Sequence, residues 1–450
     1  MKRFYVLILF VSTIIFVIWA ALELNKNTDG YLYGNSLRQN RLVNTIRLHK
    51  YGITGERIKV GVLDAGFYAA HSVFADTKIL GEYDFVTNKS TTFNKDHIKG
   101  VKHGTNVFSV IGGYLENDLI GIAYGASYYL AKSDKSSDRL WEEETLAVRA
   151  SEWLYENDVD IITTSLSFNK CDNADYYYPH QMDGKTTRIT QTADSIVNKG
   201  VLYFCSAGNK FESEWRIIEP PADGFNVLAV GAIDKFGKHS FFSSCGPTVD
   251  GRIKPDIAAP GEGVWSAKYD PKFETQFGWD HGTSLAAPIA AGVAALVLST
   301  HPNLSQFELM EAIKNSSSKA DSPDTLYGYG IPDAEKAVSY FGPAFSNTPI
   351  FEIDGNELTI ETYVFSSNGV DRSSVEVYLL EGESEKQSSY KMYEIDDDHY
   401  ACEIELENLD ADFSIYFTAK DKRGKLTKYP AGKIGDNFIL KIINERAELL

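Results

Sequence analysis

The sequence predicts an α/β fold with a doubly wound, mainly parallel sheet, followed by a smaller antiparallel β-sandwich. From residue 58 onward, short apolar runs alternate with segments of helical periodicity, which is typical of a parallel sheet with helices on both faces. Beyond residue 341, apolar residues alternate singly with polar ones, which is the pattern of half-buried antiparallel strands. The length of 450 residues also exceeds that of one typical domain.

The N-terminus carries an export signal. Lys2 and Arg3 precede an uncharged apolar stretch from Phe4 to Leu22, close to the roughly 20 residues that cross a bilayer. Bulky Trp19 makes the nearby alanines a poor cleavage site, which slightly favours an uncleaved anchor over a removed signal peptide. In both cases the positive end stays inside and the following residues are exported.

We therefore divide the chain into four segments. They are a signal-anchor or signal peptide (1–23), a linker with an N-terminal helix (24–50), the α/β domain (51–342) and the β-sandwich accessory domain (343–450).

The net charge limits the possible binding partners, and the cysteine content limits the number of disulfides. The net charge of −18 and a pI near 5.0 argue against nucleic acid as a partner. The four cysteines of an exported chain allow at most one disulfide in our interpretation, because Cys205 lies in an apolar strand-like run and fits a buried thiol.

The α/β domain has a predicted order of elements. The expected strands cover Ile58–Leu63, Tyr128–Lys132, Asp160–Ser167, Val201–Cys205 and Val227–Ala232. The expected helices cover Leu37–His49, a segment that starts at His103, Glu142–Tyr155, Ile189–Lys199 and Ala286–Leu298. Ser305 and Glu308 form a capping box that starts a further helix.

Four polar residues stand at the ends of these elements. Asp64 follows the first strand and Asn209 a later one, and functional groups gather at the carboxyl ends of parallel strands. His103 and Ser284 stand at helix starts, and at Ser284 the N-terminal dipole favours the anion that an acyl-transfer nucleophile creates. Each has an ordinary structural alternative, such as a turn or a helix cap. Together they supply the carboxylate, base, oxyanion donor and nucleophile of amide hydrolysis.

The order Asp64, His103, Ser284 is that of subtilisin, and the chain resembles the subtilase family of serine proteases, particularly exported bacterial members. The resemblance covers roughly residues 34 to 340. It rests on seven motifs, at residues 62–66 (VLDAG), 103–105 (HGT), 206–209 (SAGN), 242–247 (FSSCGP), 254–261 (KPDIAAPG), 282–288 (GTSLAAP) and 328–332 (GYGIP).

The resemblance implies a subtilisin-like fold and a role for each site residue. Ser284 would attack the scissile carbonyl, His103 would act as base and then acid, and Asp64 would orient the imidazole. The Asn209 side chain and the Ser284 backbone N–H would form the oxyanion hole. The segments Ser165-Leu166-Ser167 and Ala207-Gly208 resemble the two walls of the primary specificity pocket, where the substrate would pair as an extended strand.

The resemblance also implies a serine endopeptidase that acts on proteins or peptides outside the cytoplasm. The alternatives are a dedicated processing protease for one partner, or a catalytically silent binding protein with the sandwich as its working part. We expect no required cofactor and no metal site. Calcium binding stays open, since no acidic loop has a convincing ligand pattern, and Asp396-Asp397-Asp398 fits a solvated turn. The apolar N-terminus would contact a membrane if uncleaved, and the oligomeric state is not indicated.

Some features depart from the family pattern. Ala65 replaces a Ser or Thr that could support the aspartate, Asn106 replaces a common His, and Ser167 stands where Gly is usual. These changes bear on substrate preference more than on activity.

About 40 residues separate the apolar segment from Asp64, too few for a folded inhibitory pro-domain, so we expect the enzyme to fold without one.

Overall fold

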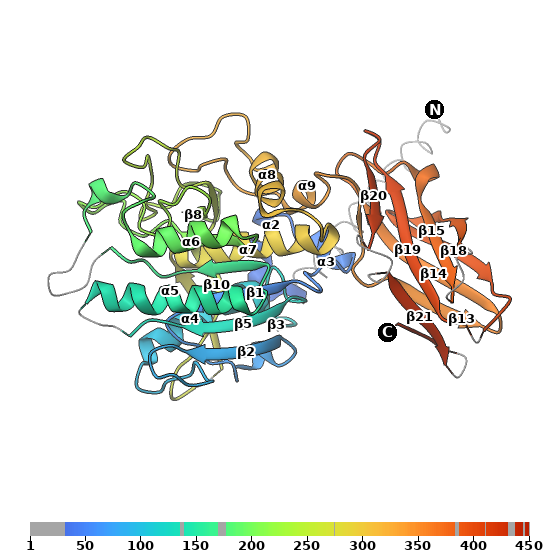
Figure 1. Cartoon of the computed structure of the whole chain (residues 1–450), viewed down its shortest axis with the longest axis horizontal. Helices are drawn as coiled ribbons and strands as arrows, with labels where there is room; N and C mark the ends of the chain where they lie inside the picture. Colours follow the sequence, from blue (N-terminus) through green and yellow to red (C-terminus); the bar gives the residue numbers. More distant parts are fainter. Residues whose placement is uncertain are drawn as a thin grey trace, which may run out of the picture.

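The computed structural model describes residues 32–135, 139–169, 177–273, 275–382, 387–409, 411–430, 437–443 and 446–449. Figure 1 shows an α/β part and, beside it, an all-β part formed by the C-terminal quarter of the chain. The expected signal segment (1–23) lies outside the described residues, as does the first part of the expected linker.

A seven-stranded sheet forms the centre of the α/β part, and all its neighbouring strands are parallel. Its order is β2 (Lys78–Asp84), β5 (Ser127–Lys132), β1 (Lys59–Asp64), β6 (Ile161–Thr164), β7 (Leu202–Ser206), β8 (Leu228–Ile233) and β9 (Ile257–Pro260). The chain first runs from β1 to one edge and then, from β6, to the other. The winding therefore reverses between β1 and β6, and the carboxyl ends of these strands border the crevice where α/β proteins bind ligands.

Helices cover both faces of the sheet (Figure 1). One core contains α4 (Ile98–Gly112) and α7 (Thr283–Thr300), and the other contains α5 (Leu140–Glu156) and α6 (Arg188–Asn198). All residues of α7 are buried, and the helix packs on β6, β7, β8 and β9. Among the described helices α7 alone is long and apolar enough to span a membrane, but its burial inside the fold makes it a core helix.

Short elements complete the α/β part. They are η1 (Gly34–Ser36), α2 (Leu37–Leu42), α3 (Ile46–Lys50), η2 (Ser72–Phe74), η3 (Pro179–Gln181), α8 (Gln306–Ser316), α9 (Ala334–Val338) and the hairpins β3 (Tyr114–Leu115) with β4 (Leu119–Ile120) and β10 (Glu262–Lys268) with β11 (Gln276–His281). The segment from residue 32 to residue 50 packs into the core, where Val43 and Leu48 are fully buried.

Two antiparallel sheets form the C-terminal part and enclose their own apolar core. The first contains β12 (Ala344–Phe345), β13 (Ile350–Asp354), β14 (Glu357–Phe365), β17 (Tyr393–Asp396) and β18 (His399–Glu405). The second contains β15 (Glu376–Glu381), β16 (Gln387–Lys391), β19 (Phe413–Lys420), β20 (Leu426–Tyr429), β21 (Phe438–Ile443) and β22 (Arg446–Leu449), and η4 (Arg372–Ser374) precedes β15.

The predicted fold class is confirmed, and three element limits are corrected. The helix expected at Leu37–His49 is broken into α2 and α3 at Asn44, whose φ is +55°. The helix expected to start at His103 begins five residues earlier, at Ile98, and its first turn already buries Val101. The strand expected to run to Ser167 ends at Thr164. The Ser305–Glu308 capping box is present.

Cysteines 205, 245 and 402 are free and buried, so no disulfide joins the cysteines that the structure describes. Cys171 lies outside the described residues. The predicted upper limit of one disulfide is compatible with these positions.

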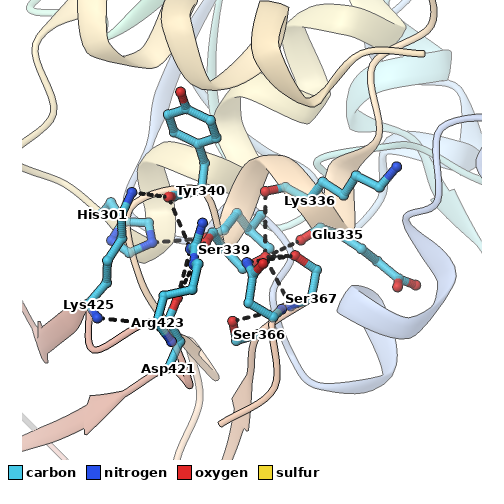
Figure 2. Close-up of polar contacts among 12 residues, drawn as sticks. His301, Glu335, Lys336, Ser339, Tyr340, Ser366, Ser367, Asp421, Arg423 and Lys425 are labelled. Atoms are coloured by element: carbon cyan, nitrogen blue, oxygen red, sulfur yellow. Dashed lines mark hydrogen bonds and ion pairs between the residues drawn. The ribbon is translucent and has the colours of Figure 1, made fainter. Parts of the chain in front are cut away.

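Basic side chains of the sandwich bind the C-terminal end of α9 (Figure 2). The Arg423 guanidinium donates to the carbonyls of Ser339 (3.2 Å) and Tyr340 (3.4 Å), and Lys425 Nζ donates to the Tyr340 carbonyl (2.8 Å). Buried Asp421 holds Arg423 in place at 2.7 Å. These contacts satisfy carbonyls that the end of a helix leaves unpaired. The negative end of the helix dipole also favours the positive charges of Arg423 and Lys425 at this position.

A buried ion cluster ties α8 to the edge of the central sheet. Asp256 precedes β9 and accepts from Lys254 Nζ (2.5 Å), Lys314 Nζ (2.7 Å) and the backbone N–H of Ala229 (2.8 Å). Burial opposes the charge of Asp256, but the two ammonium groups outweigh it and lower the pKa to about 2.

We predict that Asp256 stabilises the fold above about pH 4, since its unfolded pKa is about 3.9. This contribution is lost as the pH falls from about 4 to about 2, because the folded carboxylate must then bind a proton. Asp256→Asn should lower the free energy of unfolding at pH 7 by about 3 kcal/mol, since it leaves buried Lys254 without its counter-ion.

Urea unfolding followed by tryptophan fluorescence between pH 2 and pH 7 measures both effects. Asp321→Asn, at an exposed aspartate of the same region, should change the stability by less than about 0.5 kcal/mol. An equally steep acid-dependent loss of stability in the Asp256→Asn chain would contradict the assignment.

Candidate active site

Asp64 and His103 form a hydrogen-bonded pair at the carboxyl end of β1. The Asp64 side chain is fully buried, and its Oδ1 accepts from His103 Nδ1 at 2.7 Å and from the backbone N–H of Ala65 at 2.7 Å. The imidazole lies in the second turn of α4 and is 39% exposed. The pair therefore fixes Nδ1 of the ring and leaves Nε2 available for proton transfer.

The motif His103-Gly104-Thr105 explains how α4 approaches β1 so closely. A Cβ on Gly104 would lie 2.0 Å from the Gly66 carbonyl oxygen, so only glycine fits between the helix and the loop after β1. The Thr105 hydroxyl donates to the Val101 carbonyl (2.6 Å) and accepts from the Tyr68 backbone N–H (2.9 Å). Both residues hold the helix at the distance that the Asp64–His103 hydrogen bond needs.

The electrostatic surroundings favour a charged imidazole. Burial works against the charge, but the carboxylate of Asp64, through its charge and its hydrogen bond, raises the pKa of His103 above the ordinary value, and Asp280 and Asp134 add to this. An imidazole with a raised pKa is suited to accept a proton and to hold it.

Ser284 lies in the first turn of α7, next to Asn209. Gly282 precedes the helix with a φ of +146°, and a Cβ there would lie 2.7 Å from Ser284 Oγ and 3.8 Å from Asn209 Nδ2. The serine oxygen and the amide nitrogen thus flank the same point, and glycine keeps that point open.

Hydrogen bonds to Thr283 orient the Asn209 side chain. Its Oδ1 accepts from the Thr283 backbone N–H (2.9 Å) and hydroxyl (3.1 Å). A backbone N–H can only donate, so Oδ1 must face Thr283 and Nδ2 must point away from it. Asn209 therefore presents a donor beside Ser284 Oγ.

The sheet brings the two halves of the site together. β1 pairs with β6 so that Leu63 faces Thr164, which places Asp64 and Ser165 side by side after the strand ends. The Ser165 hydroxyl donates to the Ser284 carbonyl at 2.7 Å. Asp64, His103, Asn209 and Ser284 are thus gathered around the reversal point between β1 and β6.

The two predicted substrate-binding segments, 165–167 and 207–208, follow the adjacent strands β6 and β7. Ser165, Ala207 and Gly208 are buried, Leu166 is half-buried and Ser167 is exposed. We call these two segments the pocket walls. The Gly208 backbone N–H donates to the Thr283 hydroxyl (3.2 Å), which links one wall to the start of α7.

A residue that the sequence analysis missed lies between the walls. The Glu219 side chain is only 3% exposed, and its carboxylate accepts from Asn169 Nδ2 (2.5 Å) and from the Asn209 backbone N–H (3.3 Å). Its signal in the sequence is a lone acid after the apolar pair Ile217-Ile218, but only the fold brings it to the walls.

The departures from the family pattern have visible consequences. With Ala65 after the aspartate, Asp64 Oδ2 is buried and has no hydrogen-bond partner within the described part of the chain. Asn106, which stands where a His is common in the family, donates a hydrogen bond from Nδ2 to the Asp280 carboxylate. The same carboxylate forms an ion pair with Lys268. The Ser167 hydroxyl hydrogen-bonds to Glu219.

Comparison with known proteins decides the family. The model of the subtilase family matches residues 55–330, which include Asp64, His103, Asn209 and Ser284. The chain belongs to the subtilase family. It is a serine endopeptidase, and its substrates are proteins or peptides.

Individual relatives agree with this assignment. The subtilase is 30% identical to subtilisin DY of Bacillus licheniformis over 301 residues, 66% of this chain and 96% of that protein. It is 28% identical to subtilisin E of Bacillus subtilis over 299 residues, 65% and 68% of the two chains. The solved structure of the MycP3 protease from a type VII (ESX-3) secretion system has the same fold, with a TM-score of 0.53, 20% identity and coverage of 67% and 88%.

The Asp64–His103 contact predicts how the pKa of His103 changes when Asp64 is substituted. Asp64→Asn removes the charge that raises the pKa of His103, so burial is left as the main influence and the pKa should fall below about 6.5. Titration of the His103 ring protons by NMR measures the change. Asp280→Asn should move the pKa less, because Asp280 acts without a hydrogen bond to the ring. Equal shifts in the two variants would show that Asp64 has no special role.

Proposed function

We propose that this subtilase hydrolyses peptide bonds of proteins outside the cytoplasm, through the triad Asp64, His103, Ser284 and an acyl-enzyme. The observation that carries the proposal is the 2.7 Å hydrogen bond between His103 Nδ1 and buried Asp64, at the strand end beside Ser284. A base held by a buried carboxylate near a serine at a helix start suits acyl transfer.

Each residue has a defined task in this mechanism. Ser284 Oγ attacks the carbonyl carbon while His103 Nε2 takes its proton, and Asp64 stabilises the imidazolium that forms. The imidazolium then gives the proton to the leaving amine, which departs and leaves an ester on Ser284. Water, deprotonated by His103, hydrolyses this ester and frees the serine.

The oxyanion of each tetrahedral intermediate would lie between Asn209 Nδ2 and the Ser284 backbone N–H. Thr283 already fixes the direction of Nδ2, so the donor needs no reorientation when negative charge develops. The Ser284 N–H lies in the first turn of α7, where amide protons and the helix dipole favour an anion.

The extracytoplasmic location rests on the N-terminal sequence. Lys2 and Arg3 before an apolar stretch of signal-anchor length support export of the catalytic part. Whether the segment is cleaved decides between a membrane-tethered and a released enzyme.

A second candidate is a processing protease that cuts one partner at one site. One observation favours it: Ser167 adds a side chain to a pocket wall and binds Glu219, which restricts the substrate side chains that fit. A peptide library separates the two, since a general degrader gives a broad cleavage profile and a processing enzyme a single motif.

A membrane-impermeant, charged fluorophosphonate tests the triad and the location together. On intact cells that express the full chain, we expect covalent labelling of Ser284, because an activated serine attacks phosphorus as it attacks a carbonyl. Ser284→Ala should abolish labelling. Labelling of lysed but not intact cells would contradict the location, and no labelling in either would contradict the triad.

Asn209→Ala tests the oxyanion hole. We expect kcat to fall by about 10²–10³ with little change in KM, values taken over from the corresponding substitution in subtilisin, because the donor acts mainly on the transition state. Steady-state hydrolysis of a peptide substrate measures both constants. Asn198→Ala, at an exposed asparagine that ends α6, is the matched control and should leave both constants unchanged. A rise in KM alone for Asn209→Ala would assign the side chain to substrate binding.

A further inference from the structure

Glu219 is a buried acid that bridges the two pocket walls. Its Oε1 accepts from Asn169, two residues beyond the wall residue Ser167, and the Ser167 hydroxyl hydrogen-bonds to the same carboxylate. On the opposite side, Oε2 accepts from the Asn209 backbone N–H, directly after Gly208. The carboxylate thus lies where the two walls converge.

The absence of a side chain at Gly208 leaves the space that the Glu219 carboxylate occupies. Its φ is +106°, and a Cβ there would lie 2.2 Å from Glu219 Oε2, so any side chain at residue 208 would displace the acid. The position of the carboxylate therefore requires a glycine at residue 208, and Glu219 is packed directly against this wall.

The charge of Glu219 has no counter-ion among the described residues. The three contacts described come from an amide, a hydroxyl and a backbone N–H, and no lysine or arginine forms an ion pair with it in the part of the chain that the structure describes. Burial raises the pKa of Glu219, and the charge of exposed Lys210 opposes this only through space. A buried carboxylate gains most from a cation that arrives with its own hydrogen-bond donors.

We propose that Glu219 is the specificity-determining residue of this protease and that the enzyme cuts after lysine or arginine. The inference rests on the proposed function, because it assigns the floor of the pocket beside Ser284. An ammonium or guanidinium group between the walls would pair with Glu219, whereas an acidic side chain would be repelled and an apolar one would leave the charge uncompensated.

The depth of the acid restricts the choice further. Ser167 and Asn209 are exposed, whereas Glu219, which hydrogen-bonds to the Ser167 hydroxyl and the Asn209 backbone N–H, is only 3% exposed. Among the natural residues, only the long side chains of lysine and arginine carry a positive charge far enough to reach such a floor, with the scissile carbonyl at Ser284.

The test compares kcat/KM for peptides that differ only in the residue before the cut. For the unmodified enzyme, we expect values for lysine or arginine at least about 10-fold above those for methionine or leucine. Glu219→Gln should lower the lysine-to-methionine ratio by about 10- to 100-fold, because an amide cannot pair with the cation. An unmodified enzyme that prefers leucine or methionine would overturn the inference.

Asp223→Asn is the matched control. Asp223 is a buried acid in the same loop with a pKa also raised by burial, but it binds Thr190 (2.7 Å) and the Gly184 backbone N–H (2.8 Å), away from the walls. A purely structural effect of losing a buried acid should appear in both variants, whereas a change in the ratio should appear only in Glu219→Gln.

Binding of benzamidine, an aromatic cation, separates this inference from the proposed mechanism. The full chain with Ser284→Ala cannot form an acyl-enzyme, yet we expect it to bind benzamidine in calorimetry, with at least about 10-fold weaker binding after Glu219→Gln. Retained binding without peptide hydrolysis in the unmodified chain would contradict the triad and support the cation site. Hydrolysis with no benzamidine binding would overturn the cation site alone.

Discussion

The burial of α7 on four strands of the central sheet is the constraint on which the site depends. The helix carries Ser284 in its first turn, and its small side chains allow close packing on β6 to β9 along its whole length. A helix held in this way cannot shift without opening the main core. The position of the nucleophile relative to the strand ends is therefore set by packing, and the hydrogen bonds around it refine that position.

Two buried carboxylates work against the ordinary tendency of charges to stay in water. Asp64 has one oxygen bound to His103 and Ala65 and the other without a partner among the described residues, and Glu219 is held by neutral donors. Neither charge is fully compensated by the residues that the structure describes. Both therefore favour a positive charge nearby, on the imidazolium in one case and on a substrate in the other. The burial of these charges lowers the free energy of unfolding, and the packing of the large apolar core offsets that loss.

The sequence predicted the parts of this molecule that depend on local pattern. Strands such as β7 and β8 are short apolar runs between turns, and the motif at Ser284 combines a glycine with a run of small residues, so both can be recognised along the chain. The family resemblance then assigned Asp64, His103 and Asn209 to one site, and the sheet order brings these residues together.

Other features depend on contacts between distant segments and could not be predicted. The start of α4 lies five residues before His103, and the burial of Val101 in its first turn depends on packing against the rest of the fold. Asn44 breaks the first helix through a positive φ that its sequence does not specify. Glu219 gains its place only through Asn169 and Gly208, which are far from it along the chain.

The junction between the two parts of the chain has a consequence for the lifetime of the enzyme. A protease is a potential substrate for its own copies, and exposed connectors between folded units are preferred sites of cutting. Here no residue from Ala337 to Asn347 is exposed, and Arg423 and Lys425 hold the carbonyls at the end of α9. Asn347 also binds the Ser299 carbonyl at the far end of α7. The junction therefore offers a neighbouring molecule no exposed segment to cut, and the contact of Asn347 with Ser299 ties it to the helix that carries Ser284.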